Sequence, residues 1–372
     1  GEANVTNTGT TEWYPKRTMG PLLDEAAAKW GDRVAVSYKG ESWTFADWQR
    51  ETDRLAKGLM AYGVEPGERV AAWMVNRPEW LFIMFAIAKV GACIVPLNTR
   101  YRTDDVAYTL AQSRSSLLIS VDKSGPVDYR AMLADTMPDI EKGTDGALEL
   151  GTFPELRRVV FLGDERLPNT TSWDDMLAAG AAISDDDLQA RADAVDPNSL
   201  LMIGYTSGTT GHPKGVMQDH IVIRNVHERA QLLGMSFEDV HLNYLPMFHL
   251  YGYSELAMIS VISGAKQVLM DAFDADEALD TAEREGVTIM HGFEAHWLDL
   301  LNAQEKRPRS LKLRFGTLPS GVDSTIPIAD KVQDVFGPTI SGYGMTEAWA
   351  FITVTNLGHS REQRVNASGY PM

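Results

Sequence analysis

The sequence has little cysteine and no long hydrophobic run. Cys93 is the single cysteine, so an internal disulfide is excluded and the chain suits a reducing compartment. The apolar residues on both sides of Cys93 indicate a core position. No stretch approaches the roughly 18 consecutive apolar residues of a membrane-spanning helix, and the polar, acidic start of the chain is unlike a secretory signal peptide. We therefore expect a cytoplasmic protein with no transmembrane segment.

Positive charge is also scarce. The 34 lysines and arginines are outnumbered by 51 aspartates and glutamates, which gives a formal net charge of −17. This balance argues against nucleic acid and anionic membranes as partners, because both bind basic surfaces. A phosphate-bearing ligand would need a local positive site. With 372 residues, 44% of them apolar, the chain can fold into two or three packed layers.

Short apolar runs alternate with helical patterns along most of the chain. The first set is a strand at 69–75, a helix at 78–90, a strand at 92–95, a helix at 103–112 and a strand at 117–121. This alternation is typical of a mostly parallel sheet covered on both faces. A second such set extends from about 200 to 340. We therefore expect an α/β fold with two mostly parallel sheets flanked by helices.

The stretch at 205–217 concentrates hydroxyl groups, glycines and one lysine, directly after an apolar strand pattern at 199–204. Its hydroxyl residues and glycines are Thr206, Ser207, Gly208, Thr209, Thr210, Gly211 and Gly215. Glycines let backbone N–H groups turn inward as an anion nest, hydroxyls add donors, and Lys214 adds a mobile charge. The stretch therefore predicts a polyphosphate-binding loop, with an ordinary Gly/Ser/Thr-rich surface loop as the alternative.

Two other motifs do not fit this stretch. A Walker-type loop has glycine directly before the lysine and Ser or Thr directly after it, whereas Pro213 precedes Lys214 and Gly215 follows it. A serine-hydrolase elbow, Gly-x-Ser-x-Gly, would need its serine one position before Ser207. A nucleophilic serine is therefore not expected.

The segment Thr206-Ser-Gly-Thr-Thr-Gly-His-Pro-Lys-Gly215 resembles the phosphate-loop signature of the AMP-forming adenylating enzymes. That superfamily includes acyl-CoA synthetases, the adenylation domains of peptide synthetases and firefly luciferase. Lys89-Val-Gly-Ala-Cys-Ile-Val-Pro-Leu-Asn98 is similar to a second segment of the family, which we interpret as structural. The resemblance covers nearly the whole chain.

The resemblance implies a division of the fold. Residues 1–372 would be the large N-terminal domain, with a first α/β subdomain at 48–197, a second at 20–47 and 198–345, and the start of a small β-barrel-like subdomain at 346–372. A ribose-binding aspartate, a hinge and a C-terminal lid domain with a charge-neutralising lysine would follow in the family and are absent here. We therefore expect this chain to bind nucleotide without efficient adenylation.

A second strong motif is Gly342-Tyr-Gly-Met-Thr-Glu347. It is not a dinucleotide fingerprint, because Glu347 stands where a third glycine would be. It is similar to a family motif in which Tyr343 would stack on adenine, Thr346 would bind the α-phosphate and Glu347 would hold Mg²⁺. A hard cation of this kind binds carboxylate together with substrate phosphates. The alternative is a glycine-rich turn with a solvated glutamate.

The segment Met247-Phe-His249-Leu-Tyr-Gly252 resembles the family's Phe-His-x-x-Gly loop, in which the histidine lies beside the acid's carboxylate and the α-phosphate. Amino-acid-activating domains usually carry Asp in place of this histidine, so we expect an acid without an α-amino group. Pro319-Ser-Gly-Val322 stands where the family has an adenine-binding turn. The large aromatic residues near these segments could wall an acyl pocket, although a buried aromatic residue is more often plain core.

All four loops follow strands, so we expect them to converge at the carboxyl ends of the strands of one open sheet. The catalytic candidates are Thr206, Lys214, His249, Thr346 and Glu347. The cofactor-binding candidates are Thr206, Ser207, Gly208, Thr209, Thr210, Gly211, Lys214, Ser320, Gly321, Gly342, Tyr343, Gly344, Met345 and Thr346. The substrate-binding candidates are His249, Tyr251, Tyr253, Phe293 and Trp297, and the metal candidates are Thr206 and Glu347.

The reaction implied by the resemblance is an in-line attack of the acid's carboxylate on the α-phosphorus of ATP, with loss of pyrophosphate. The carboxylate is already ionised, so positioning and charge stabilisation would suffice. The predicted function is an AMP-forming ligase that joins a fatty or aromatic carboxylic acid to CoA, with ATP, Mg²⁺ and CoA as cofactors. Two alternatives remain open: an enzyme that loads a carrier-protein thiol, and a non-catalytic nucleotide-binding module. A homodimer is compatible with the sequence, which does not decide the oligomeric state.

Overall fold

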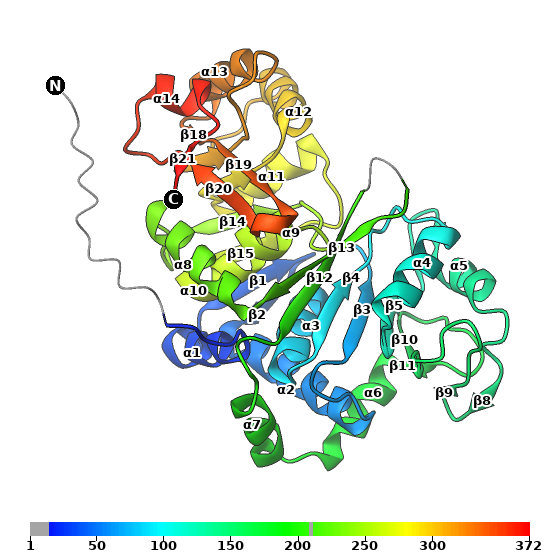
Figure 1. Cartoon of the computed structure of the whole chain (residues 1–372). Helices are drawn as coiled ribbons and strands as arrows, with labels where there is room; N and C mark the ends of the chain where they lie inside the picture. Colours follow the sequence, from blue (N-terminus) through cyan, green and yellow to red (C-terminus); the bar gives the residue numbers. More distant parts are fainter. Residues whose placement is uncertain (1–14, 208–210) are drawn as a thin grey trace.

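The computed structural model describes residues 15–207 and 211–372 (Figure 1). Two seven-stranded sheets form the body of the molecule, and a three-stranded sheet lies near the carboxyl end of the chain. Most strand pairs within the large sheets are parallel, so the expected α/β class with two mostly parallel sheets is confirmed. Within the described residues, no helix is long and apolar enough to cross a membrane.

The first sheet has the strand order β11-β10-β5-β3-β4-β12-β13. Its strands are β3 (Arg69–Trp73), β4 (Cys93–Pro96), β5 (Leu117–Val121), β10 (Arg158–Leu162), β11 (Thr171–Ser172), β12 (Leu200–Thr206) and β13 (Lys214–Asp219). Its associated helices are α2 (Phe45–Ala61), α3 (Pro78–Lys89), α4 (Thr103–Ser113), α5 (Tyr129–Thr136), α6 (Trp173–Ala179) and α7 (Asp185–Asp193). The alternating pattern of the sequence therefore corresponds to real elements.

The second sheet has the order β18-β17-β16-β14-β15-β1-β2. Its strands are β1 (Val34–Tyr38), β2 (Glu41–Thr44), β14 (Val240–Asn243), β15 (Lys266–Leu269), β16 (Ile289–His291), β17 (Phe315–Thr317) and β18 (Thr339–Ile340). The remaining helices are α1 (Gly20–Trp30), α8 (Ile223–Leu232), α9 (Leu250–Gly252), α10 (Ile259–Ser263), α11 (Ala275–Glu285), α12 (Glu294–Lys306), α13 (Ile326–Val335) and α14 (Arg361–Asn366). A π-helical turn, Tyr253–Met258, joins α9 to α10.

Shorter elements complete the chain. The third sheet consists of β19 (Gly342–Met345), β20 (Ala350–Val354) and β21 (Tyr370–Pro371). Two small hairpins are β6 (Lys123–Ser124) with β7 (Val127–Asp128), and β8 (Gly143–Thr144) with β9 (Ala147–Leu148). The 3-10 turns are Gly180–Ala182, His220–Val222 and Thr346–Ala348.

The sheet to which β12 and β13 belong differs from the expected division. We expected 198–345 to form one subdomain, but β12 pairs in parallel with β4 of the first sheet, and β13 pairs with β12. The apolar strand β12 pairs with β4 in the first sheet. Hydrophobic periodicity predicts that a strand forms but not which strand it pairs with. Strand pairing therefore groups β12 and β13 with the first sheet, and the expected boundary at 197/198 lies before these two strands instead of after them.

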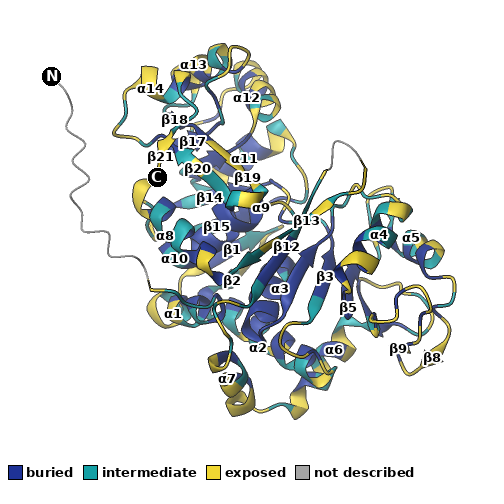
Figure 2. Ribbon diagram, in the orientation of Figure 1, coloured by how far each residue is buried: buried dark blue, intermediate teal, exposed yellow. Residues whose placement is uncertain are grey.

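The core is built from helices and strands that the sequence makes almost wholly apolar. Every residue of α3 except Glu79 is buried, and α3 packs against α2 (Figure 2). Lys89 at the end of α3 is the charged exception, and its amine lies 2.9 Å from Asp24 Oδ1 of α1 and 2.7 Å from Asp53 Oδ1 of α2. This ion-pair cluster joins three helices at one buried point.

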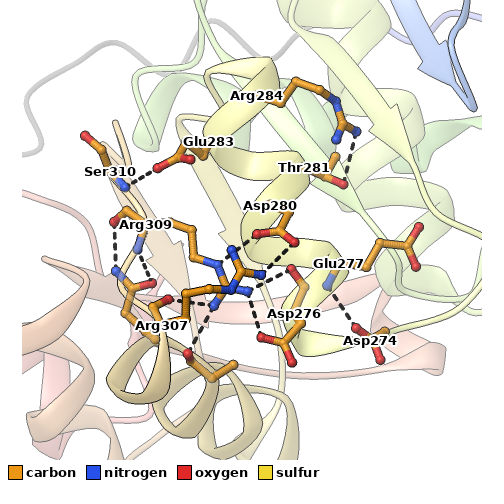
Figure 3. Close-up of polar contacts among 12 residues, drawn as sticks. Asp274, Asp276, Glu277, Asp280, Thr281, Glu283, Arg284, Arg307, Arg309 and Ser310 are labelled. Atoms are coloured by element: carbon orange, nitrogen blue, oxygen red, sulfur yellow. Dashed lines mark hydrogen bonds and ion pairs between the residues drawn. The ribbon is translucent and has the colours of Figure 1, made fainter.

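A second ion-pair cluster fastens the segment after α12 to α11 (Figure 3). Arg309 contacts Asp276 at 2.7 Å and Asp280 at 2.9 Å, and Arg307 contacts Asp280 at 2.9 Å. Hydrogen bonds from Arg307 and Arg309 lower the pKa of Asp280 to about 2. The folded structure therefore stabilises the ionised form of the Asp280 carboxyl.

Candidate active site

Strands β12 and β13 form an antiparallel hairpin, which we call the phosphate hairpin. Its register places Thr206 opposite Lys214 at the end where the loop joins the two strands, and the Thr206 hydroxyl donates to the Lys214 carbonyl at 3.5 Å. Lys214 is exposed, and none of the ion pairs among the described residues uses its amine. Gly208, Thr209 and Thr210 lie outside the described residues. Strand β13 was not expected, because the sequence pattern was interpreted as a loop that continues to the next helix.

The hairpin packs against α4. The Tyr205 hydroxyl donates to Gln112 Oε1 at 2.6 Å, and the ring of His212 stacks on Tyr108 with centroids 4.1 Å apart. Gly211 has a φ of +144°, which favours glycine at that position. These contacts position both strands that flank the phosphate-loop motif.

The second motif is attached directly to the hairpin. Gln218 of β13 donates from Nε2 to the Thr346 carbonyl at 2.9 Å and to the Glu347 carbonyl at 3.2 Å. A Cβ built on Gly204 would lie 3.2 Å from Thr346 Cγ2, so the turn packs closely on β12. Glu347 is exposed and forms no ion pair with any residue the structure describes. The residues joined by the first of these bonds are 128 positions apart in sequence, so two distant motifs lie side by side.

Strand β19 carries the start of this second motif. It pairs with β20, and a Cβ on Gly344 would lie only 1.6 Å from the Ala350 carbonyl oxygen, so the close approach requires glycine. Tyr343 is 55% exposed. Ser320 is buried, and its hydroxyl donates to the Val365 carbonyl at 2.6 Å, so that hydroxyl holds the turn in place. Gly321 follows with a φ of +100°.

A cavity of about 380 Å³ lies beside β19, and we call it the acid pocket. Its lining consists of His249, Leu250, Tyr251, Phe293, Pro319, Gly342, Tyr343, Gly344, Met345, Thr346, Ala350 and Phe351. His249, Tyr251 and Phe293 also line a neighbouring cavity of about 460 Å³ that reaches Asn76 and Arg100. Desolvation lowers the pKa of His249, which keeps its ring neutral at pH 7. The structure therefore brings His249 together with every residue of the Gly342 to Thr346 segment.

Two of the expected acyl-binding residues lie elsewhere. Tyr253 is fully buried, packs edge-on against Trp349 and donates to Met19 Sδ at 3.7 Å. Trp297 is fully buried too, and its Nε1 donates to the Thr317 carbonyl at 3.0 Å. Neither residue lines the two cavities described above. Tyr251 and Tyr253 are two positions apart on a helical segment, so their side chains point to different faces, and only Tyr251 reaches the acid pocket.

The expected convergence at one sheet is also wrong in its details. The phosphate hairpin belongs to the first sheet, whereas β17 and β18 belong to the second and β19 to the third. The motifs instead come together where the hairpin meets the Thr346–Ala348 turn. Phe351 and Ala350 line the acid pocket but were not candidates, because no motif marked them. Pro319 lines it too, although only Ser320 and Gly321 of its motif were candidates.

The fold and the site together define a layered α/β protein in which two glycine-containing motifs lie side by side. The chain belongs to the AMP-binding enzyme family, whose model matches residues 23–372. YngI of Bacillus subtilis (strain 168), to which an acyl-CoA synthetase function is ascribed, is 32% identical over 363 residues, which cover 95% of this chain and 65% of that protein. The mitochondrial medium-chain acyl-CoA ligase of Rattus norvegicus is 28% identical over 320 residues, covering 82% of this chain and 50% of that protein. The chain thus spans about half to two thirds of the length of these curated relatives.

Solved structures share the fold. An anthranilate CoA ligase in complex with anthranoyl-AMP superposes with a TM-score of 0.80 at 21% identity, covering 96% of this chain and 65% of that one. The o-succinylbenzoate CoA synthetase from Bacillus subtilis, in complex with its acyl-adenylate intermediate, gives a TM-score of 0.72 at 23% identity and covers 96% of this chain and 64% of that one. Because the sequence identities of 21% and 23% are low, the structural similarity to these two enzymes establishes the fold of this chain alone.

Proposed function

We propose that the chain acts in an AMP-forming acid–CoA ligase, which joins a fatty or aromatic carboxylic acid to CoA through an acyl-adenylate. The observation that carries the proposal is the bond between β13 and the Thr346–Ala348 turn. Gln218 fixes the carbonyls of Thr346 and Glu347, and this contact joins the phosphate hairpin to the strand that lines the acid pocket. Family membership and the two acyl-CoA ligase relatives support the same activity.

The residues present fit a nucleotide with Mg²⁺. Glu347 is an exposed carboxylate without an ion-pair partner in the described part of the chain, and Mg²⁺ in nucleotide sites takes one or two carboxylates together with phosphate oxygens. Glu347, with the Thr206 hydroxyl, would hold the ion, which would supply charge neutralisation at the phosphates. Lys214, opposite Thr206 on the hairpin, neutralises further negative charge. Tyr343 at the pocket wall offers a face on which adenine stacks.

His249 and Thr346 line one pocket, so a carboxylate bound beside His249 lies next to the turn that carries the phosphate ligands. The neutral ring of His249 orients the carboxylate by donating a hydrogen bond. One carboxylate oxygen attacks the α-phosphorus, the α–β phosphoanhydride bond breaks, and pyrophosphate leaves with the electron pair. A thiol then attacks the acyl carbon, and AMP leaves. The chain contributes positioning and charge stabilisation, because no proton must be removed from an ionised acid.

Calorimetry of ATP–Mg²⁺ binding tests the proposal. Lys214→Ala and Glu347→Gln should each weaken binding by about 10- to 100-fold, because each removes a charge-assisted contact. Lys331→Ala and Glu305→Gln are matched controls, since both residues are exposed on α13 and α12, away from the site. Unchanged affinity in both site variants would contradict the proposal.

Pyrophosphate exchange tests the chemistry itself. In a protein that contains this chain, Lys214→Ala should lower the exchange rate by about 10²- to 10³-fold, the usual effect of removing one donor to developing charge. Thioester formation with CoA, beside a phosphopantetheine-bearing carrier protein, identifies the thiol acceptor. An exchange rate that Lys214→Ala leaves intact would show that the hairpin is not the phosphate site.

A further inference from the structure

A smaller cavity lies beside the acid pocket. It has a volume of about 20 Å³, which is room for about one water-sized group. Tyr251, Pro319, Gly342 and Phe351 line both spaces, so the two cavities adjoin at these residues. We call this space the polar cavity, because charged and imidazole side chains are among the residues that line it.

The first polar group is a buried ion pair. Arg229 of α8 and Glu255 of the π-helical turn are almost fully buried, with 2.6 Å between Nε and Oε1. Ser254 links them, since it accepts from Arg229 Nη2 and donates to Glu255 Oε1, both at 3.1 Å. Arg229 Nη1 is buried without a hydrogen-bond partner in the part of the chain that is described. A π-helical turn inside a helix often marks a functional site.

The second polar group is a chain of hydrogen bonds. The Tyr251 hydroxyl contacts Thr317 Oγ1, which lies 2.8 Å from His291 Nδ1, and His291 Nε2 lies 3.1 Å from His241 Nδ1. His241 Nε2 is buried, and it has no partner among the residues described. Burial lowers the pKa of His241 to about 4 and the pKa of His291 well below its ordinary value, so both rings are neutral.

The neutral rings make this chain directional. A single hydrogen lies between the two imidazoles, so the tautomer of one fixes that of the other. When Tyr251 donates to Thr317, Thr317 donates to His291, and His291 donates from Nε2 to His241 Nδ1. His241 then keeps its own hydrogen on Nε2, the unpartnered nitrogen. When the chain runs in the opposite direction, His241 Nε2 is an acceptor instead. In either direction the polar cavity is lined by two residues with an unpartnered polar atom among the residues described, a donor on Arg229 and a ring nitrogen on His241.

We infer that the acid substrate carries a hydroxyl or keto oxygen at the end of its chain remote from the carboxylate, and that Arg229 and His241 bind this oxygen in the polar cavity. This inference rests on the proposed function, because only an acyl group in the acid pocket would direct its tail past Tyr251 and Phe351. A methyl-ended tail would leave both groups unpaired, which a site built for hydrogen bonding penalises. A carboxylate-ended tail would exceed the volume and would face Glu255.

The experiment uses non-hydrolysable acyl-adenylate mimics, the acyl sulfamoyl adenosines, titrated calorimetrically into the wild-type chain. Tails of matched length end in methyl, hydroxyl, keto or carboxylate, over a graded series of lengths. At the length that reaches the cavity, the hydroxyl or keto tail should bind about 10- to 100-fold more tightly than the methyl tail, as expected for a hydrogen bond to a charged donor. Equal or tighter binding of the methyl tail at every length would refute the inference while leaving the proposed function intact. Failure of every mimic to bind would refute both.

Variants identify the residues responsible. The double variant Arg229→Met with Glu255→Gln removes both charges at similar volume, so no buried charge is left unpaired. This double variant and His241→Phe should each reduce the preference for an oxygenated tail toward unity. His220→Phe is the matched control, because His220 is equally buried but lines none of the cavities described here. A preference that survives in both cavity variants would overturn the assignment.

Discussion

His220 should make the protein less stable as the pH falls below neutrality. Its side chain is fully buried, and Nδ1 accepts a hydrogen bond from the Met19 amide at 3.0 Å, which requires that nitrogen to be unprotonated. Desolvation lowers the pKa of His220 from 6.5 to about 4. Below pH 6.5 the unfolded chain therefore binds a proton that the folded chain does not, and the free energy of unfolding falls until the pH reaches about 4.

The magnitude follows from the size of this window. At about pH 5 the solution lies roughly 1.5 units below the unfolded pKa, and each unit is worth about 1.4 kcal/mol, so His220 alone should cost about 2 kcal/mol. His241 and His291, which are also buried and neutral, act in the same direction. The loss from His220 alone is therefore a substantial fraction of the usual total stability of a domain, about 5–15 kcal/mol.

The assay is urea unfolding at about pH 7.5 and about pH 5 for the wild type and for His220→Gln. Glutamine does not titrate, and its carbonyl oxygen can still accept from the Met19 amide. The drop in the free energy of unfolding between the two pH values should be about 2 kcal/mol smaller in the variant. Effects of the carboxylates are common to both proteins and cancel in this difference. An equal drop in both proteins would refute the reasoning, because it would mean that His220 takes up its proton in the folded state.

Three further perturbations follow from the described contacts. Lys89→Met leaves the aspartates of α1 and α2 without their cation and should lower the free energy of unfolding by about 3 kcal/mol, with Lys89→Arg as the control in the same urea titration. Asp280→Asn should lower the free energy of unfolding at neutral pH and make it depend less on pH in acid. The stability that the Asp280 carboxylate contributes is present above pH 3.8 and is lost as the pH falls toward about 2. Thermal unfolding of the wild type and the variant at neutral pH and near the lower end of this range measures the difference. Gln218→Ala removes both bonds to the Thr346–Ala348 turn and should weaken ATP–Mg²⁺ binding about tenfold in calorimetry, whereas Gln189→Ala on α7 should not.

Most of the elements could be predicted from the sequence, but their partners could not. The helix expected at 103–112 is α4, Thr103–Ser113, and the strand expected at 117–121 is β5. The local hydrophobic periodicity and the residues that interrupt it are enough to predict the bounds of these two elements. The pairing of β12 with β4 depends on which sheet edge is free, and strand β13 is an edge strand with a mixed pattern, so neither could be derived from local sequence.

The candidate site shows the same limit. Motif residues such as His249 and Thr346 do line one pocket, whereas Trp297, chosen for its size alone, is core. The sequence contains one weak indication of the Arg229–Glu255 pair. A charged residue that is buried in a helix needs a partner of opposite charge. Such a signal predicts that a partner exists but does not identify it.

The elements that would perform chemistry are distinct from those that would select the acid. The phosphate hairpin, β19 and the Thr346–Ala348 turn hold the motif residues, and Gln218 joins them. The polar cavity is built instead by α8, the π-helical turn, β14 and β16. Substitutions at Arg229 and His241 can therefore change the preferred tail without moving Lys214 or Glu347. Because Tyr251 both lines the acid pocket and lies at one end of the hydrogen-bond chain, the tail and the carboxylate end of a bound acid would affect each other through this residue.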